Sequence, residues 1–506
     1  MNNTLPPADN TRGLLKSVAV IGSAKFLSIL IRIVKAKLVA VMLGPSGTGL
    51  LGVFSSLQML VAQMAGLGLP QSAVRQLASS QGDQDLLARL KSVLFVMLGL
   101  QGGVAMAAVW LLREPISVWL LGDAQSATGI GLVGVVILLF LLSSSQQTLL
   151  RGMRRINDQS RVMVLGTLAG AVAGIAAILL LGREGLIWFL IAETTGAFLV
   201  GAFYVRRLPL PAVDRPPLAE IWQLWKPMVR LGAAFMLGGL VHFATLLVIR
   251  TLITRDLGLD AAGQFAAAWT ITFTYIGFLV QAMLTDYLPR LIEVIRDRES
   301  AARLMNDQMQ LALTLGGPLL LVMTGLAPWL IRLLYSAEFD AAATVLQWQM
   351  AGAVMMLTTR TMGASFIAAG RSMVFLYIQL QFNALFLLAI WLGLPVLGIE
   401  AAGVAYLFAH ALQIVMVALL ARRLNGFRWQ TGSVRIFAAT ALLVFAMLAL
   451  ARLAPGAAAI AAPALAAAIT LIGGRRVLGR IGPQGRLVSR AHRFYAAIGW
   501  PVEHSS

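Results

Sequence analysis

Four cations lie within the first membrane-length apolar run of this sequence. They are Lys25, Arg32, Lys35 and Lys37, in the segment 17–43. A single cation near the centre of a bilayer costs roughly 2.5–3.5 kcal/mol on insertion scales. Several such charges in one helix therefore indicate a function, and we expect them to face a water-filled cavity that receives an anion.

Three of these cations share one helical face. On an α-helix, Lys25 and Arg32 differ in direction by only about 20°, and Lys35 lies about 80° from Lys25 on the side nearer Arg32. Lys37 points elsewhere, and we expect it to snorkel towards the headgroups. Because a planar guanidinium bonds phosphate oxygens in pairs, Arg32 is the first candidate for binding a diphosphate. The alternative is that the cations of this face are buried against carboxylates or helix-end carbonyls.

Later apolar runs hold further ionisable candidates. Arg250 and Arg360 are predicted to support Arg32, Lys25 and Lys35 at the anion site. Buried carboxylates can titrate near neutral pH, and the intramembrane carboxylates predicted to couple transport to an ion are Glu193 and Asp286. The alternative for each carboxylate is a salt bridge to one of the cations.

Uncharged polar side chains also lie in the predicted spans. Thr270 and Thr274 share a helical face. Together with Gln281 they are candidates for hydrogen bonds to sugar hydroxyls, although threonine also packs well between membrane helices. His242 and His410 are single intramembrane histidines, which we interpret as hydrogen-bonded core residues.

Composition places all of these residues in a membrane protein. The chain has 506 residues, 59% hydrophobic and 12% charged, whereas an ordinary soluble protein is about 25% charged. Repeated runs of about 20 apolar residues predict an all-α polytopic membrane protein with about 14 transmembrane helices. The predicted spans are 17–43, 48–70, 88–112, 129–150, 162–182, 185–205, 228–253, 262–288, 309–334, 341–369, 373–395, 400–421, 434–453 and 456–473.

The net charge of +19 comes mostly from the loops on one side of these spans. This bias predicts that both termini are cytoplasmic and explains the charge without nucleic acid. The chain has no cysteine, which excludes disulfides and a thiol nucleophile. Because the sequence shows no P-loop, no HExxH and no nucleophile constellation, we expect no cofactor, no metal site and no catalytic residue.

A weak repeat divides the chain into two halves. The segments 43–49 (LGPSGTG) and 257–263 (LGLDAAG) each join the first two spans of a half. A proline-rich stretch between the sixth and seventh spans is predicted to be a linker. Two such repeats are a common transporter design, with the substrate site between them. The predicted regions are an N-lobe 1–206, a cytoplasmic linker 207–227, a C-lobe 228–425, an extra helix pair 426–474 and a basic cytoplasmic tail 475–506.

These motifs resemble a known family of exporters. The matching stretches are 35–50 (KAKLVAVMLGPSGTGL), 67–75 (LGLPQSAVR), and, in the second half, Arg250, 257–258 and 288–291 (LPRL). The chain is similar to the Wzx-type polysaccharide translocases of the multidrug/oligosaccharidyl-lipid/polysaccharide exporter superfamily. The resemblance covers most of 15–425 and implies two six-helix lobes that form a V around a central cavity.

The resemblance also implies a function. Wzx-type proteins flip undecaprenyl-diphosphate-linked oligosaccharide repeat units from the cytoplasmic to the periplasmic leaflet of the bacterial inner membrane, for O-antigen or other surface polysaccharides. Membrane lipids, a polysaccharide polymerase and glycosyltransferases of the same pathway are then the expected partners. Because related lipid II flippases have fourteen spans, a peptidoglycan-precursor flippase is one alternative. A multidrug cation antiporter is another, although it should carry more carboxylates than cations in its spans, and a glycan ligase or polymerase would need a large periplasmic loop.

Overall fold

The protein is almost entirely helical. The computed structural model describes residues 8–211, 217–481, 486–497, 500 and 502, and over these residues it contains α-helices and short 3₁₀ turns but no strand. Contacts between the helices divide the chain into two compact units. Unit 1 comprises 1–263 with 334–338, and unit 2 comprises 264–333 with 339–506. The predicted all-α membrane fold class is confirmed.

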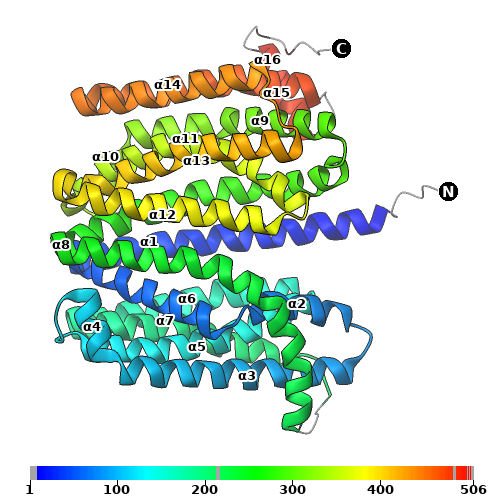
Figure 1. The fold of residues 1–506 in the computed structure, drawn as a ribbon, viewed down its shortest axis with the longest axis vertical. Helices are drawn as coiled ribbons and strands as arrows, with labels where there is room; N and C mark the ends of the chain where they lie inside the picture. Colours follow the sequence, from blue (N-terminus) through cyan, green and yellow to red (C-terminus); the bar gives the residue numbers. More distant parts are fainter. Residues whose placement is uncertain (1–7, 212–216, 482–485, 498–499, 501, 503–506) are drawn as a thin grey trace. The chain divides into compact units, whose positions relative to one another are not determined.

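Unit 1 is a bundle in which α3, α5, α7 and α6 pack successively against one another, and α1 packs along α6 (Figure 1). Its core is made of apolar side chains from these helices, including Leu98, Val136 and Phe189. The elements of unit 1 are α1 (Ala8–Ala65), α2 (Leu69–Ser79), α3 (Gln84–Leu111), α4 (Arg113–Leu121), α5 (Ala127–Gly152), α6 (Ile156–Leu181), η1 (Gly182–Glu184), α7 (Gly185–Arg206) and the first part of α8 (Leu218–Val294).

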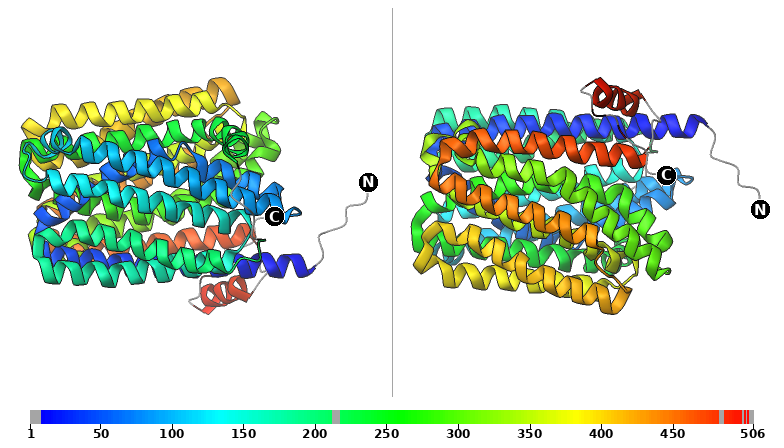
Figure 2. Two further views of the ribbon diagram at one scale, coloured as in Figure 1. Left: turned by 90° about the horizontal axis from the view of Figure 1, so that it is seen from below. Right: turned by 90° about the horizontal axis from the view of Figure 1, so that it is seen from above.

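Unit 2 has its own helical core, in which α11 packs against α9 and α13, and α13 packs against α12. The C-terminal helices α14 and α15 both lie along α9 (Figure 2). Its elements are the second part of α8, α9 (Arg298–Gly325), α10 (Ala327–Leu334), η2 (Ala337–Phe339), α11 (Asp340–Ala368), α12 (Ser372–Leu397), η3 (Gly398–Glu400), α13 (Ala401–Asn425), α14 (Thr431–Leu453), α15 (Pro455–Ile481) and α16 (Arg486–Ala497).

The helices correspond to the predicted spans in chain order. Seven stretches of the described residues are long and apolar enough to cross a membrane, or eight with a bent pair. Three of these stretches, 156–206, 236–294 and 372–425, have 51, 59 and 54 residues. Each is long enough for two crossings, because one crossing needs about 20 residues.

The repeated LGxxxxG segments interrupt two long helices. Gly44 in α1 has φ 63° and Gly258 in α8 has φ 86°, so each helix is really two helices joined at a break. This left-handed region favours glycine, which explains the first glycine of each repeat. The last glycine of each repeat, Gly49 or Gly263, packs closely against the backbone of the other repeat. A Cβ on Gly49 would lie 2.2 Å from the carbonyl oxygen of Leu259, and one on Gly263 would lie 2.0 Å from that of Pro45.

Several predicted boundaries are wrong for local reasons. The span 48–70 ends at Ala65, because Leu67 and Gly68 adopt positive φ and the short helix α2 follows. The span 309–334 is bent by 79° between α9 and α10. The predicted linker 207–227 is helical from Leu218, where α8 begins. The short helices α4 and α16 were not predicted as separate elements.

The division into units also differs from the predicted boundary at the linker. The first part of α8, which holds the predicted seventh span, belongs to unit 1 and not to the second half. The physical reason is its packing on α1, through the reciprocal glycine contacts described above and through Arg250.

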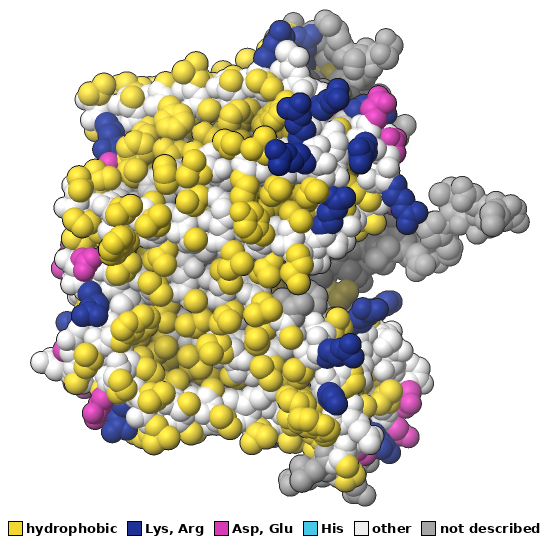
Figure 3. Space-filling view, in the orientation of Figure 1, with side chains coloured by type: hydrophobic (Ala, Val, Ile, Leu, Met, Phe, Trp, Pro, Cys, Tyr) yellow, Lys and Arg dark blue, Asp and Glu magenta, His cyan; other side chains and the backbone are white. Residues whose placement is uncertain are grey.

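Cations gather at the helix ends of each unit, while apolar side chains cover the helix lengths (Figure 3). The last turns of α5 and α7 carry Arg151 and Arg206, and the last turn of α13 carries Arg422 and Arg423. These ends fall on the side that the sequence predicts to be cytoplasmic, so the orientation rests on the positive-inside bias and stays a prediction.

Candidate functional site

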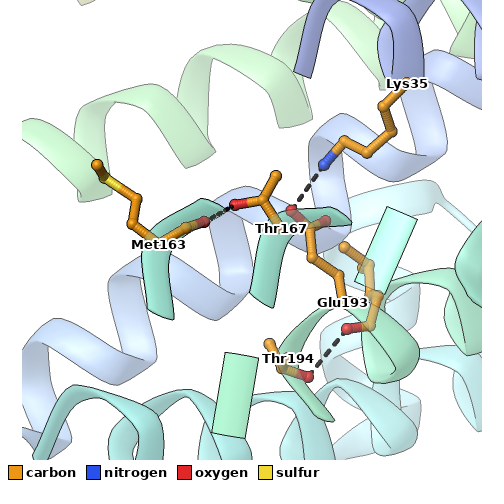
Figure 4. A network of polar contacts seen from close by, with 6 residues as sticks. Lys35, Met163, Thr167, Glu193 and Thr194 are labelled. Atoms are coloured by element: carbon orange, nitrogen blue, oxygen red, sulfur yellow. Dashed lines mark hydrogen bonds and ion pairs between the residues drawn. The ribbon is translucent and has the colours of Figure 1, made fainter. Parts of the chain in front are cut away.

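Lys35 forms an ion pair with Glu193, one of the two predicted coupling carboxylates. The Lys35 Nζ lies 2.7 Å from Glu193 Oε1, and the two side chains are 16% and 30% exposed (Figure 4). The ammonium group also lies 5.2 Å from the centre of the Phe189 ring. The geometry therefore matches the alternative interpretation of both residues, in which a half-buried cation and carboxylate neutralise each other.

Close packing of α6 and α7 fixes the position of Glu193. A Cβ on Gly170 would lie 2.6 Å from the Cα of Glu193, so only glycine permits this approach. Near the pair, Thr167 donates a hydrogen bond to the Met163 carbonyl (2.7 Å), and Thr194 donates to the Leu190 carbonyl (2.9 Å) (Figure 4). Both hydroxyls are satisfied by their own helices, so Lys35 is the charged partner of Glu193.

The other two cations of the predicted face are accessible. Lys25 and Arg32 are exposed, and over the described residues neither forms an ion pair. Ser28, which points the same way, is buried. The predicted face is therefore divided: its Lys35 edge packs against α7, and its Lys25 and Arg32 edge stays open. An anion approaching α1 would meet two uncompensated positive charges.

The sequence predicted that Lys37 snorkels towards the headgroups, but the structure gives its ammonium group a partner within the protein. Its Nζ donates a hydrogen bond to the carbonyl oxygen of Tyr335, which follows α10. Segment 334–338 belongs to unit 1 by its contacts, so this hydrogen bond lies within unit 1. No sequence signal marks this partner, because a backbone carbonyl is present at every residue.

Arg250 is buried between α8 and α1. Its side chain is 7% exposed, and Nη1 donates to the Gly52 carbonyl and, at 2.7 Å, to the Ser56 hydroxyl. Both acceptors lie in the second part of α1. This arrangement joins two helices of unit 1 and leaves little of the guanidinium accessible, so the predicted role in binding a diphosphate is not supported by an open position.

Arg360 lies on α11 in unit 2. Its side chain is exposed at the edge of a cavity of about 80 Å³ between α8, α11, α12 and α13. Gln379 and Gln413 line the same cavity. These two glutamines were not among the predicted site residues, although a polar side chain inside an apolar span is the signal that would have found them.

The predicted sugar-binding residues are all on α8 in unit 2. Thr270 and Gln281 are exposed and Thr274 is half-buried, so the three are accessible along one helix. Asp286 is also on α8, but its side chain is 71% exposed and pairs with Arg290 one turn later, at 3.0 Å. This surface pair matches the salt-bridge alternative for Asp286, with a different cation from those considered.

His410 is a core residue, as the sequence suggested. It is buried, its Nδ1 lies 3.0 Å from Gln413 Oε1, and its ring lies 4.4 Å from that of Phe382. His242 lies against Phe243, with ring centroids 5.4 Å apart. Among the described residues, no group of three or more His, Asp or Glu side chains is placed to hold a metal ion.

The fold defines the class of protein. Solved structures of the same arrangement include an inward-facing multidrug resistance MATE transporter of the MOP superfamily (TM-score 0.65, 16% identity, 81% of this chain and 98% of that one). They also include the lipid II flippase MurJ in an inward closed conformation (TM-score 0.66, 14% identity, 95% and 99%). The chain therefore has the fold of the MOP-superfamily transporters.

Sequence comparison defines the family within that class. Residues 14–293 match the family model described as polysaccharide biosynthesis protein, and the chain belongs to this family. It is 24% identical over 383 residues to the lipid III flippase of Escherichia coli (strain K12), covering 74% of this chain and 90% of that protein. It is 23% identical over 347 residues to the succinoglycan biosynthesis transport protein ExoT of Rhizobium meliloti (strain 1021), covering 68% and 66%. The resemblance seen in the sequence is confirmed.

Proposed function

We propose that this protein is a flippase for an undecaprenyl-diphosphate-linked oligosaccharide repeat unit. It moves the unit from the cytoplasmic to the periplasmic leaflet of the inner membrane by alternating access, for O-antigen or another surface polysaccharide. The observation that carries the proposal is the open pair of cations, Lys25 and Arg32, on α1, the helix that holds the first predicted span. The family and its relatives support a lipid-linked cargo.

In this mechanism the diphosphate binds first to Arg32, with Lys25 two turns away on the same face. Guanidinium and phosphate match in geometry, and each charge-assisted hydrogen bond contributes about 1.5–3 kcal/mol. Lys35 is available only if the incoming diphosphate displaces Glu193 from it. The prenyl tail would stay in lipid, and Thr270, on α8 in unit 2, stays a separate proposed contact for the sugars.

The test of this site is Arg32→Ala beside Arg32→Lys, scored by surface glycan at matched protein level. Loss of a bidentate contact should weaken binding about 10-fold to 100-fold, with partial recovery in the lysine variant. Arg183→Ala is the control, because Arg183 is an exposed cation in the short η1 turn outside α1. Full glycan display by Arg32→Ala would remove Arg32 from the mechanism.

Ion coupling through Glu193 is a separate proposal with its own test. If Glu193 only neutralises Lys35, Glu193→Gln should impair transport, and the double variant with Lys35→Met should restore it. If Glu193 carries the coupling ion, the double variant should stay inactive. Arg360 stays a proposed second phosphate contact in unit 2, to be tested by Arg360→Ala in the same glycan assay.

A lipid II-type flippase is the second candidate function. The observation that favours it is the likeness to MurJ over 95% of this chain and 99% of that one. Expression in a strain depleted of its lipid II flippase distinguishes the two proposals. Growth of that strain would favour the peptidoglycan precursor, whereas restored surface polysaccharide in a translocase-deficient strain would favour the proposed cargo.

A further inference from the structure

A large cavity lies in unit 1 at the ends of α3, α5 and α7. Its volume is about 800 Å³, and the start of α8 also contributes to its wall. Phe95, Leu149 and Phe198 give it a mostly apolar lining. None of the cations of α1 lines this cavity, so it is separate from the proposed diphosphate site.

Two cations stand at this cavity. Lys91 is in the second turn of α3, and Arg206 is the last residue of α7. Over the described residues neither forms an ion pair, although the neighbouring Arg89 is neutralised by Glu220. The same lining therefore combines two uncompensated positive charges with a long apolar interior.

A buried polar atom lies in the wall of the cavity. Gln146, which also lines the cavity, is 4% exposed, and its Oε1 has no hydrogen-bond partner. Gly201 makes room for this side chain, since a Cβ there would lie 2.1 Å from Oε1. A buried polar atom without a partner costs about 1–3 kcal/mol. Because Oε1 is fully buried and faces the Gly201 backbone, it belongs to the wall between α5 and α7 and is not a contact for a ligand in the cavity.

We propose that this cavity binds one anionic phospholipid of the cytoplasmic leaflet. The lipid phosphate would lie between Lys91 and Arg206, and an acyl chain would fill the apolar interior beside Phe95 and Phe198. A free phosphate ion would leave that interior empty, whereas a zwitterionic lipid such as phosphatidylcholine would bring its own ammonium group close to the two cations. Basic pockets between membrane helices on the cytoplasmic side suit anionic headgroups. The bound lipid would join the ends of α3 and α7 to the start of α8.

The experiment is native mass spectrometry of the full chain released from nanodiscs of phosphatidylcholine doped with phosphatidylglycerol. The parent protein should retain one phosphatidylglycerol. The double variant Lys91→Gln/Arg206→Gln should bind it about 30-fold more weakly, because each cation near an anionic surface contributes about 1 kcal/mol. Arg422→Gln/Arg423→Gln is the matched control, because it removes two cations from the end of α13, and it should retain the lipid as the parent does.

A second variant tests the apolar part without changing charge. Ala202 lines the cavity, so Ala202→Phe should exclude the acyl chain and reduce phosphatidylglycerol retention, while a size-exclusion profile reports folding. Equal loss in the control pair, or unchanged retention in both cavity variants, would overturn the proposal. Displacement of phosphatidylglycerol by undecaprenyl diphosphate would also overturn it, since the cavity would then hold the cargo. Surface glycan display by the same variants is measured separately. The proposed function rests on Lys25 and Arg32 of α1, so the lipid-retention result and the glycan result test different proposals.

Discussion

The contact between the two LGxxxxG repeats leads to a sharp prediction about Gly49 and Gly263. Both glycines have ordinary helical backbone, so alanine causes no conformational strain at either position, and only the space for a methyl group matters. Each added Cβ would meet a backbone carbonyl oxygen of the opposite repeat, at 2.2 Å for Gly49 and 2.0 Å for Gly263. No side chain can rotate away, so the two segments must separate by about 1 Å to restore normal contact.

The magnitude follows from two opposing terms. Overpacking costs about 1–3 kcal/mol, and we expect the upper end because backbone must move. Replacing a helical glycine by alanine returns about 0.5–1 kcal/mol. Gly49→Ala and Gly263→Ala should therefore each destabilise the protein by roughly 2 kcal/mol. Because one separation relieves both clashes, the double variant should cost clearly less than the sum of the single variants.

Thermal unfolding in detergent, followed by tryptophan fluorescence, measures this effect. Gly103→Ala in α3 is the control, because no atom lies within 4 Å of its added Cβ, and it should be neutral or slightly stabilising. If Gly49→Ala and Gly263→Ala melted like Gly103→Ala, the repeats would not be in close contact. Strict additivity in the double variant would show that the two glycines act independently.

Two further predictions concern stability. Arg250→Ala should destabilise the protein by about 2–4 kcal/mol, because it leaves a cavity and removes the hydrogen-bond donor for Gly52 and Ser56. Arg250→Met should destabilise it less, because methionine fills the space and carries no buried charge. The same thermal unfolding assay compares the two variants. Asp297 caps the N-terminus of α9, and hydrogen bonds from Ser300 hold the pKa of this exposed carboxyl below its usual range. A carboxyl whose pKa is lowered in the folded state stabilises the fold at pH values above the ordinary pKa of about 3.9, and this stabilisation is lost as the pH falls through the folded-state pKa. The melting temperature of Asp297→Ala should therefore lie below that of the parent at neutral pH and approach it in acid. If the melting temperature of Asp297→Ala stayed equally far below that of the parent in acid, the carboxylate charge would not contribute to stability.

Local patterns determined much of the architecture. A run of about 20 apolar residues has to form a helix in a membrane, so hydropathy located the spans without knowledge of their neighbours. The repeated LGxxxxG segment likewise marked two places where glycine was needed, and both first glycines adopt positive φ. The breaks after Ala65 and within 309–334 were missed because their causes, two positive-φ residues and a packing bend, leave little trace in hydropathy.

The partners of the charged residues were decided only by the tertiary structure. Periodicity placed Lys25, Arg32 and Lys35 on one face, because helical direction depends only on spacing. It could not say that Lys35 would meet Glu193, more than a hundred residues away, or that Arg250 would be buried against α1. Ion pairing depends on which helices pack together and at what height, and that is set by contacts across the whole unit. The sequence by itself therefore identified the cations and their common face, and packing decided that Lys25 and Arg32 alone of that face stay open.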